Sequence, residues 1–280
     1  MIADGPLVTI IVATLNSAHR LPRCIASIAT QTYPRRELVV MDGGSTDGTV
    51  DIIQTASPVT YWESSPDRGI YHAWNKALAH AHGEWICFLG ADDYFWSPTA
   101  LSRIAETFAT RPPQARIVYG RVAVVNSGGE VLEDAGRPWQ RQDRGSLRHL
   151  PVPYPATFHH ASVFRQHGGF DESFRIAGDY DLLVRALETA DAHFVDEILV
   201  GMEVGGISSA VVNERLVWRE ILRVWRKHQL TPVVPLWWWW TYTRVWVRAL
   251  LRGAVGERLA RRLLDLYRRA TGRPGVWSRR

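Results

Sequence analysis

The stretch LVTIIVATLN, residues 7–16, decides the fold of this chain. Its first eight residues form a short, β-branched run, which is typical of a strand buried on both faces. The next stretch, LPRCIASIATQT (residues 21–32), carries its apolar residues at helical spacing. Three more strands follow in alternation with helices, at residues 37–42, 59–64 and 84–90. This order predicts an α/β protein with a mainly parallel sheet that is flanked by helices.

The composition fits a globular protein with a large core. The chain has 280 residues, of which 46% are hydrophobic, enough for one large domain or for one domain with an appendage. Its two cysteines, Cys24 and Cys87, both lie within apolar patterns, so we expect neither a disulfide framework nor a zinc cluster. The first residues lack the basic and apolar regions of a secretory signal. We therefore expect the protein in the cytoplasm.

Positive charge gathers near the C-terminal end of the sequence. Residues 244–280 hold eleven arginines and two acidic residues, whereas the net charge of the whole chain is only +5. The remaining part is therefore mildly acidic, and this argues against nucleic acid as a partner.

Polar side chains follow all four predicted strands. In chain order they are Asn16, Asp42, Asp67 and the pair Asp92 and Asp93. Because ligands bind beyond the carboxyl ends of parallel strands, we expect these residues to share one ligand-binding edge. An isolated acidic pair would be explained more simply by a capped turn. The three other polar strand ends favour the ligand site.

The pair Asp92 and Asp93 stands between the apolar run CFLGA and three aromatic residues. Neighbouring side chains of an extended chain point to opposite sides, so we expect only one of these carboxylates to bind an ion unless the backbone turns between them. Mg²⁺ or Mn²⁺ is satisfied by one or two carboxylates together with substrate phosphates. The pair therefore predicts a divalent cation that is bound with a nucleotide diphosphate.

Five motifs occur in order within residues 7–209: TIIVATLN, VVMDGGSTDGT, SSPDRGIYHAWNKAL, FLGADDY and GGFDESFRIAGDYDLLVR. The glycine spacings of a dinucleotide fold and of a P-loop are both missing. Together the motifs resemble family-2 glycosyltransferases with a GT-A (Rossmann-like) fold, especially bacterial enzymes of O-antigen, capsule and exopolysaccharide synthesis. The resemblance implies an inverting transfer from a nucleotide-sugar donor, with uridine favoured as the base.

Carried over residue by residue, the resemblance assigns the polar strand ends to the donor. It implies that Asp93 coordinates the Mg²⁺ or Mn²⁺ ion on the diphosphate, while Asp92 faces the ribose or the donor sugar. Four further residues would surround the nucleotide, with Asp42 accepting a hydrogen bond from the base: Ala13, Thr14, Asp42 and Asp67.

The motif AGDYDLLVR carries the general base that the resemblance implies. Asp179 matches the family's acid before a Tyr or Trp, although Gly178 stands where a Glu is often found. Such a carboxylate accepts the proton of the attacking acceptor hydroxyl. Asp181 is the competing residue. It lies at the start of a helical pattern, where a first-turn acid has a structural explanation.

Two histidines, His159 and His160, precede a strand-like ASVF. Such a pair contacts phosphate, acceptor or metal near an active site, or else packs within a loop. We place His160 on the acceptor side, with Asp181 as the other candidate there. The segment GGISS (residues 205–209) is either a closing segment with glycine hinges or a plain surface turn.

The composition of the sequence changes after residue 209, where it becomes rich in Trp and Arg. We predict a catalytic domain at residues 1–209 and a helical, Trp- and Arg-rich extension at residues 210–280. The uncharged run at residues 230–243 is shorter than the roughly 20 residues that span a bilayer.

Tryptophans favour membrane interfaces, and the last predicted helix places leucines on one face and arginines on the other. We therefore expect the extension to bind an anionic membrane at the inner face of the cytoplasmic membrane, beside a polyprenyl-linked glycan acceptor. The alternative is an amphipathic helix packed on the catalytic domain.

Two other functions account for parts of the pattern. A sugar nucleotidyltransferase would share the sheet and the ion, but it needs a glycine-rich basic loop that TLNSAHR (residues 14–20) does not supply. A non-catalytic nucleotide-binding scaffold at the membrane would have lost its acids. The four acids Asp42, Asp92, Asp93 and Asp179 are all present, which favours the enzyme.

Overall fold

One nine-stranded sheet organises the computed structural model, which describes residues 5–126, 128–204, 213–231, 233, 236–256, 259–260, 262–263 and 266. The strands are β1 (Val8–Thr14), β2 (Arg36–Asp42), β3 (Val59–Ser64), β4 (Trp85–Gly90), β5 (Asp93–Phe95), β6 (Ala115–Val125), β7 (Val131–Ala135), β8 (Thr157–His160) and β9 (Asp191–Glu203). The α-helices are α1 (Leu21–Ala29), α2 (Thr49–Thr55), α3 (Ile70–Leu78), α4 (Ala100–Thr110), α5 (Ser162–His167), α6 (Gly178–Leu187), α7 (Glu214–Lys227) and α8 (Leu236–Val255). Two short 3₁₀ helices, η1 (Arg144–Arg148) and η2 (Tyr154–Ala156), precede β8.

The two halves of the sheet differ in strand direction. The strand order is β3-β2-β1-β4-β8-β6-β9-β5, with β7 paired to β6. The first four strands pair in parallel, as the alternating sequence pattern predicts. Beyond β4 the pairing is mixed, because β8 runs antiparallel to β4 and β6 while β9 runs parallel to β6.

One local prediction in the second half was wrong. The stretch ASVF, expected as a strand, lies at the start of α5, and the two histidines before it end strand β8. Val163 is buried from the helix rather than from a strand. Periodicity cannot separate a strand from a helix in so short an apolar run.

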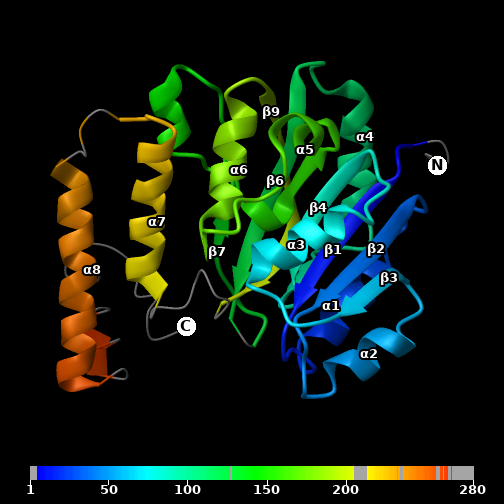
Figure 1. Cartoon of the computed structure of the whole chain (residues 1–280), viewed down its shortest axis with the longest axis horizontal. Coiled ribbons are helices and arrows are strands. Elements are labelled where there is room, and N and C mark those ends of the chain that lie inside the picture. The colour runs from blue at the N-terminus through cyan, green and yellow to red at the C-terminus, as the bar shows by residue number, and fades with distance from the viewer. Residues whose placement is uncertain are drawn as a thin grey trace.

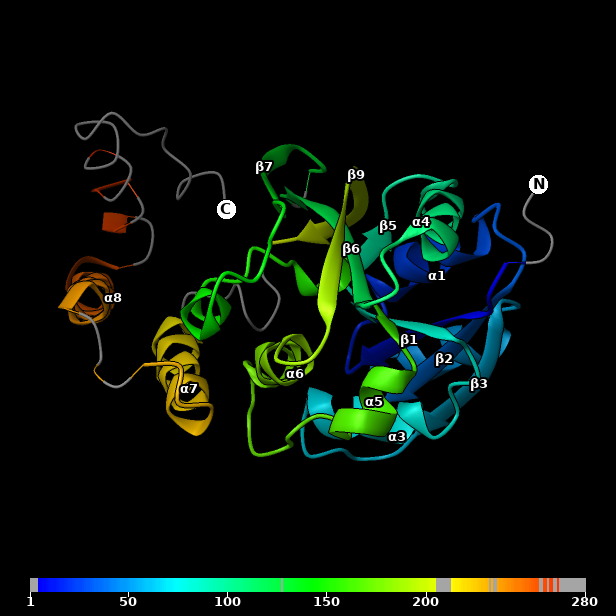
Figure 2. The ribbon, with the colours of Figure 1, turned by 90° about the horizontal axis from the view of Figure 1, so that it is seen from above.

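Helices cover both faces of the sheet, which gives three layers (Figures 1 and 2). One core contains side chains of α3, α5 and α6, and the other contains those of α1 and α4. Strand β1 contributes side chains to both cores, since Ile11 lies in the first while Ile10 and Val12 lie in the second. The carboxyl ends of β1 to β4 therefore open on one edge between two helical layers.

The last two described helices extend from α6, with α7 beside it and α8 on the outer side of α7 (Figures 1 and 2). Trp225 of α7 and Trp238 of α8 are buried in the same core as Leu182 of α6. The predicted domain boundary and the GGISS segment fall outside the described residues, so the division stays a prediction. No helix in the described part is long and apolar enough to cross a membrane.

Candidate active site at the carboxyl edge of the sheet

The loops after β1 and β2 are joined by hydrogen bonds. The Asn16 amide donates to Ser45 Oγ (2.7 Å), and Asn16 Oδ1 accepts from the Thr46 amide (3.0 Å). Asn16 has a φ of 47°, a left-handed conformation that Asn tolerates better than most residues. These bonds hold two strand ends together at the predicted edge.

Asp42 lies at the end of β2 and is only 2% exposed. Its Oδ2 accepts hydrogen bonds from the amides of Gly44 (3.0 Å) and Ser45 (2.9 Å). The same oxygen accepts from Ser64 Oγ at the end of β3 (2.6 Å). The carboxylate therefore shapes the loop after its own strand and ties that loop to the neighbouring strand.

Asp67 lies beside the same loop. Its Oδ1 accepts from the Gly69 amide (2.9 Å), and its Oδ2 is 2.8 Å from the place where a Cβ at Gly43 would stand. Thr14, at the end of β1, is nearly buried, and its hydroxyl has no hydrogen-bond partner among the described residues. Ala13 before it is half-buried against the core. An unpartnered buried hydroxyl costs free energy unless a ligand satisfies it.

The chain turns at residues 91–92, between β4 and β5. A Cβ at Gly90 would lie 2.6 Å from Asp92 Oδ1 and 3.2 Å from Asp93 Oδ2. Both carboxylates therefore approach the same side of Gly90, and the predicted opposition of the two side chains was wrong. The prediction assumed an extended chain, whereas the turn brings the carboxylates to one place.

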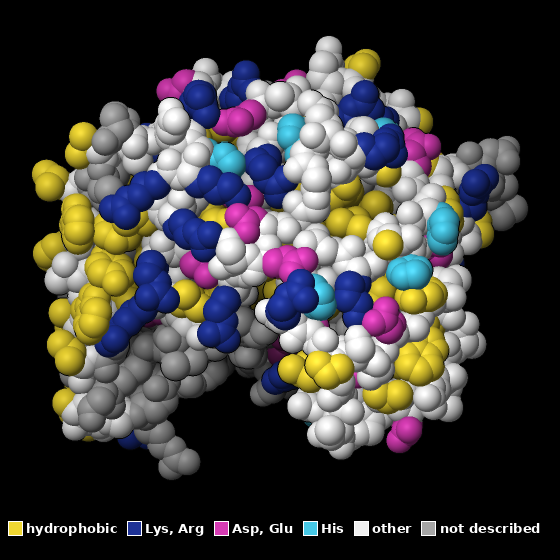
Figure 3. All heavy atoms as spheres, in the orientation of Figure 1, with side chains coloured by type: hydrophobic (Ala, Val, Ile, Leu, Met, Phe, Trp, Pro, Cys, Tyr) yellow, Lys and Arg dark blue, Asp and Glu magenta, His cyan; other side chains and the backbone are white. Residues whose placement is uncertain are grey.

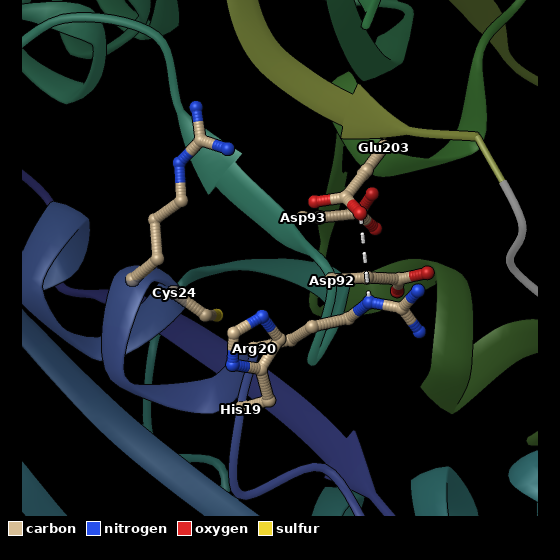
Figure 4. A pocket seen from close by; sticks show the side chains of 7 residues that line it. His19, Arg20, Cys24, Asp92, Asp93 and Glu203 are labelled. Carbon is tan, nitrogen blue, oxygen red and sulfur yellow. Dashed lines mark ion pairs between the residues drawn. The ribbon is translucent and has the colours of Figure 1, made fainter. Parts of the chain in front are cut away.

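A cavity of about 170 Å³ opens beside this pair (Figure 4). Strand pairing of β5 with β9 sets Asp93 opposite Met202 and so brings the next residue, Glu203, to the cavity. Arg20 Nε lies 3.7 Å from Glu203 Oε1, and the Arg23 guanidinium stacks 3.5 Å above the Tyr94 ring. The lining side chains are His19, Arg20, Arg23, Cys24, Asp92, Asp93 and Glu203.

Sequence reasoning missed the cavity residues outside the acidic pair. Arg20 and Arg23 stand on the polar side of an ordinary amphipathic pattern, and Glu203 ends an apolar strand. Nothing in those patterns distinguishes them from surface residues. Only the antiparallel pairing of β5 with β9 brings Glu203 near Asp93.

Asp93 is buried and Asp92 is half-buried, and both have raised pKa values. Burial raises the pKa of Asp93 well above its usual range, and the charge of Asp92 raises it further, while the Gly90 amide (2.8 Å) lowers it. Burial also raises the pKa of Asp92. The described residues contain no cluster of three metal-ligating side chains. A single carboxylate such as that of Asp93 fits a Mg²⁺ or Mn²⁺ ion whose coordination is completed by substrate phosphates.

Asp179 stands in the first turn of α6, against the first turn of α3. The Tyr71 hydroxyl lies 3.2 Å from Asp179 Oδ1, which also accepts from the Tyr180 amide (2.7 Å). Burial raises the pKa of Asp179 to about 6, although these two hydrogen bonds lower it. A carboxylate with a pKa near 6 can accept a proton at neutral pH.

Packing against Tyr71 explains why this chain has Gly178 where the family motif often has Glu. A Cβ there would stand 2.8 Å from the Tyr71 ring, closer than real side chains pack. A Glu at this position would therefore displace the tyrosine that contacts Asp179.

Asp181 is fully buried and surrounded by basic side chains. Its carboxylate lies 3.1 Å from Arg185 Nε and 2.8 Å from both Lys227 Nζ and His228 Nε2. Burial alone would raise its pKa, but the hydrogen bonds from His228 and Lys227 lower it. These contacts give Asp181 a structural explanation and leave no room for an acceptor.

The two histidines lie at the opposite edge of the sheet. His160 pairs with Trp85, the first residue of β4, whereas the acidic pair follows the last residue of β4. About 17 Å of strand separates the two ends at about 3.3 Å per residue. His159 is a core residue whose pKa is lowered to about 4 by burial. The position of His160 contradicts its predicted contact with an acceptor.

Comparison with known proteins supports the sequence resemblance. The family model described as "Glycosyl transferase family 2" matches residues 9–166. The PGL/p-HBAD biosynthesis glycosyltransferase of Mycobacterium tuberculosis is 32% identical over 227 residues, which cover 77% of this chain and 84% of the relative. Chondroitin synthase of Pasteurella multocida is 27% identical over 211 residues, 74% of this chain and 22% of that protein.

Two solved structures share the fold at low sequence identity. The mannosyltransferase PcManGT of Pyrobaculum calidifontis, in complex with GDP-Man and Mn²⁺, has a TM-score of 0.63 and 22% identity over 96% of this chain and 80% of its own. S. aureus TarS 1-349 in complex with UDP-GlcNAc has a TM-score of 0.60 and 20% identity over 78% of this chain. The chain spans 66% of that TarS fragment, just under two thirds.

The contact between Tyr71 and Asp179 predicts a pKa change. Because the tyrosine hydroxyl lowers the pKa of Asp179, Tyr71→Phe should raise that pKa above 6. Titration of the carboxyl carbon by ¹³C NMR measures it directly. Tyr33→Phe is the control, since the Tyr33 hydroxyl donates to the Pro6 carbonyl (2.6 Å) and its ring packs in the other core. An unchanged pKa in Tyr71→Phe would show that the two groups do not interact.

Proposed function

Because this chain belongs to glycosyltransferase family 2, we propose that it is an inverting, metal-dependent glycosyltransferase. It moves a sugar from a nucleotide diphosphate sugar, with UDP-sugars favoured, to a hydroxyl group of a glycan acceptor in the synthesis of cell-surface polysaccharide. The observation that carries the proposal is the acidic pair, Asp92 and Asp93, whose pKa values are both raised and which line one cavity with Arg20 and Arg23.

The cavity residues suit the diphosphate end of a donor. Asp93 would bind the Mg²⁺ or Mn²⁺ ion, and Asp92 would face the ribose or the sugar. A bound divalent ion stabilises the charge that grows on the departing diphosphate. The cavity is too small for a whole nucleotide sugar, so the base would lie further along the edge. There it would meet Ala13, Thr14, Asp42 and Asp67.

Asp179 would act as the general base on the other side of the sugar. The attacking hydroxyl loses its proton as the new bond forms, and an ionised carboxylate accepts it. With a pKa of about 6, Asp179 is mostly ionised at pH 7 and mostly protonated at pH 5. The rate should therefore rise with pH through about 6.

We also propose that the acceptor is linked to a polyprenyl lipid and that the protein binds the inner face of the cytoplasmic membrane. Large apolar side chains of α8 are exposed: Leu236, Trp237, Trp239, Trp240, Val247 and Leu250. Figure 3 shows apolar side chains gathered along the edge of the molecule that α8 forms, with Lys and Arg side chains beside them. Exposed tryptophans beside basic residues favour an anionic membrane interface.

Two substitutions should separate donor binding from catalysis. Asp93→Ala should remove the metal-dependent binding of nucleoside diphosphate, because it deletes the carboxylate assigned to the ion. Asp179→Asn should keep that binding and lower turnover by about 10²- to 10⁴-fold, because a general base is lost. Calorimetric titration of UDP, GDP, dTDP and CDP, with and without Mn²⁺, measures binding and identifies the base.

Asp51→Ala on the exposed face of α2 is the control for both variants, and it should behave as the wild type. Equal loss of nucleotide binding in Asp93→Ala and Asp179→Asn would contradict the assigned roles. Absence of any nucleotide binding by the wild type would contradict the proposed function itself.

Membrane binding predicts the behaviour of a triple variant. Leu236→Ser, Trp240→Ser and Leu250→Ser together should weaken binding to phosphatidylglycerol vesicles at least about 100-fold, because three large apolar groups no longer leave water. A flotation assay measures the bound fraction. Serine substitution of two other exposed apolar residues, Val131 and Trp62, is the control. Flotation of the triple variant at the wild-type level would rule out α8 as the membrane contact.

A further inference from the structure

A buried carboxylate on α7 contacts the turn that leads into α6. Glu220 is only 5% exposed. Its Oε1 accepts from the amide of Arg175 (2.9 Å), and its Oε2 accepts from the amides of Ile176 (2.8 Å) and Ala177 (2.9 Å). Three consecutive backbone amides thus converge on one side chain that comes more than forty residues later in the chain.

This arrangement holds the turn before the helix and differs from an ordinary helix cap. The first amides of an α-helix have no partner within the helix, and a side chain at the N-cap position usually satisfies one of them. The N-cap residue of α6 is Ala177, which has no side chain that could do so. Glu220, from another helix, binds the amide of this N-cap residue and the two amides before it. Its negative charge also suits the positive end of the α6 dipole.

The turn held by Glu220 is in direct contact with the base. The single proton of the Tyr71 hydroxyl is shared between the carbonyl of Ile176 (2.5 Å) and Asp179 Oδ1 (3.2 Å). The amide of the same Ile176 is bound by Glu220. A shift of this residue would therefore move the hydroxyl that contacts Asp179.

Other residues of α7 hold the far side of Asp179. Trp225 Nε1 donates to the Tyr180 hydroxyl (2.9 Å), which in turn donates to the Leu147 carbonyl (2.9 Å). Lys227, at the end of the helix, contacts the buried Asp181 carboxylate. Residues on both sides of Asp179 are thus held by one helix.

We propose that α7 positions the general base and that Glu220 is its principal positioning residue. The inference rests on the proposed function, because it takes Asp179 as the base. Glu220 fixes the turn at residues 175–177, and this turn sets the first turn of α6 and the contact between Tyr71 and Asp179. A misplacement of about 1 Å in a reacting group can lower a rate by about 10²-fold.

The test compares Glu220→Gln, Glu220→Asp and Glu220→Ala in the full chain. Glu106→Gln is the matched control, because it makes the same change at an exposed position of α4. Turnover is measured as hydrolytic release of nucleoside diphosphate from the sugar nucleotide whose diphosphate binds in the calorimetric experiment. Calorimetry with that diphosphate and Mn²⁺ reports the donor site, and hydrogen–deuterium exchange reports the amides of residues 175–177.

We expect Glu220→Gln to lower kcat by about 10- to 100-fold while the metal-dependent affinity for the diphosphate stays within twofold. Exchange should become faster at residues 175–177, where amide partners are lost. Glu220→Asp should recover part of the rate, since it keeps the carboxylate, and Glu220→Ala should recover none. Glu106→Gln should match the wild type in all three measurements.

Two results would overturn the positioning role. One is an unchanged kcat in Glu220→Gln, with Asp179→Asn inactive. The other is a parallel loss of kcat and diphosphate affinity in Glu220→Gln, which would mean that Glu220 only maintains the fold. A fully active Asp179→Asn would instead refute the general base, and with it the proposed function of that residue. The outcomes for the two proposals are therefore distinct.

Discussion

A carboxylate that is buried in a protein needs hydrogen-bond donors or a cation, and this requirement shapes the whole edge where the parallel strands end. Asp42 takes its donors from the loop that follows it and from Ser64, and this fixes the loops around β2. Asp181 takes its partners from Arg185, Lys227 and His228, and this fastens α7 to α6. In both cases the buried charge determines how neighbouring segments are joined.

Asp93 and Asp179 stand out against these two residues. The Gly90 amide is the hydrogen bond that lowers the pKa of Asp93, and burial outweighs it. The pKa of Asp179 stays raised in the same way despite two hydrogen bonds. Groups that the fold leaves under-stabilised in this manner are poised to exchange a proton or to bind a cation. The number of partners therefore distinguishes Asp93 and Asp179, to which we assign the ion and the proton transfer, from Asp42 and Asp181, whose carboxylates also join segments of the fold.

The sequence predicted the features that depend on local pattern. The first four strands, their parallel order and the polar residues that follow them all come from short periodic segments. The turn between β4 and β5 was not predicted, because two adjacent acids do not show whether the chain stays extended. His160 was misplaced for a similar reason, since the direction of β8 depends on its pairing with β4 and β6.

Contacts between distant segments could not be predicted at all. Glu203 reaches the cavity through strand pairing, and Glu220 reaches the turn before α6 across the packing of two helices. In the sequence, Glu220 is one charged residue within an amphipathic helix rich in arginine. Its burial and its three amide partners follow only from the way α7 lies against α6.

The contacts between α7 and the segment that begins α6 also limit how members of this family could exchange their C-terminal segments. A recombination junction near residue 209 would pair α6 of one parent with α7 of another and would separate Glu220 from the amides that it binds. A junction between α7 and α8 would keep those contacts within one parent and would exchange only the outer, tryptophan-rich helix. Functional chimeras should therefore be found with the second kind of junction. The segment that must come from one parent extends to the end of α7.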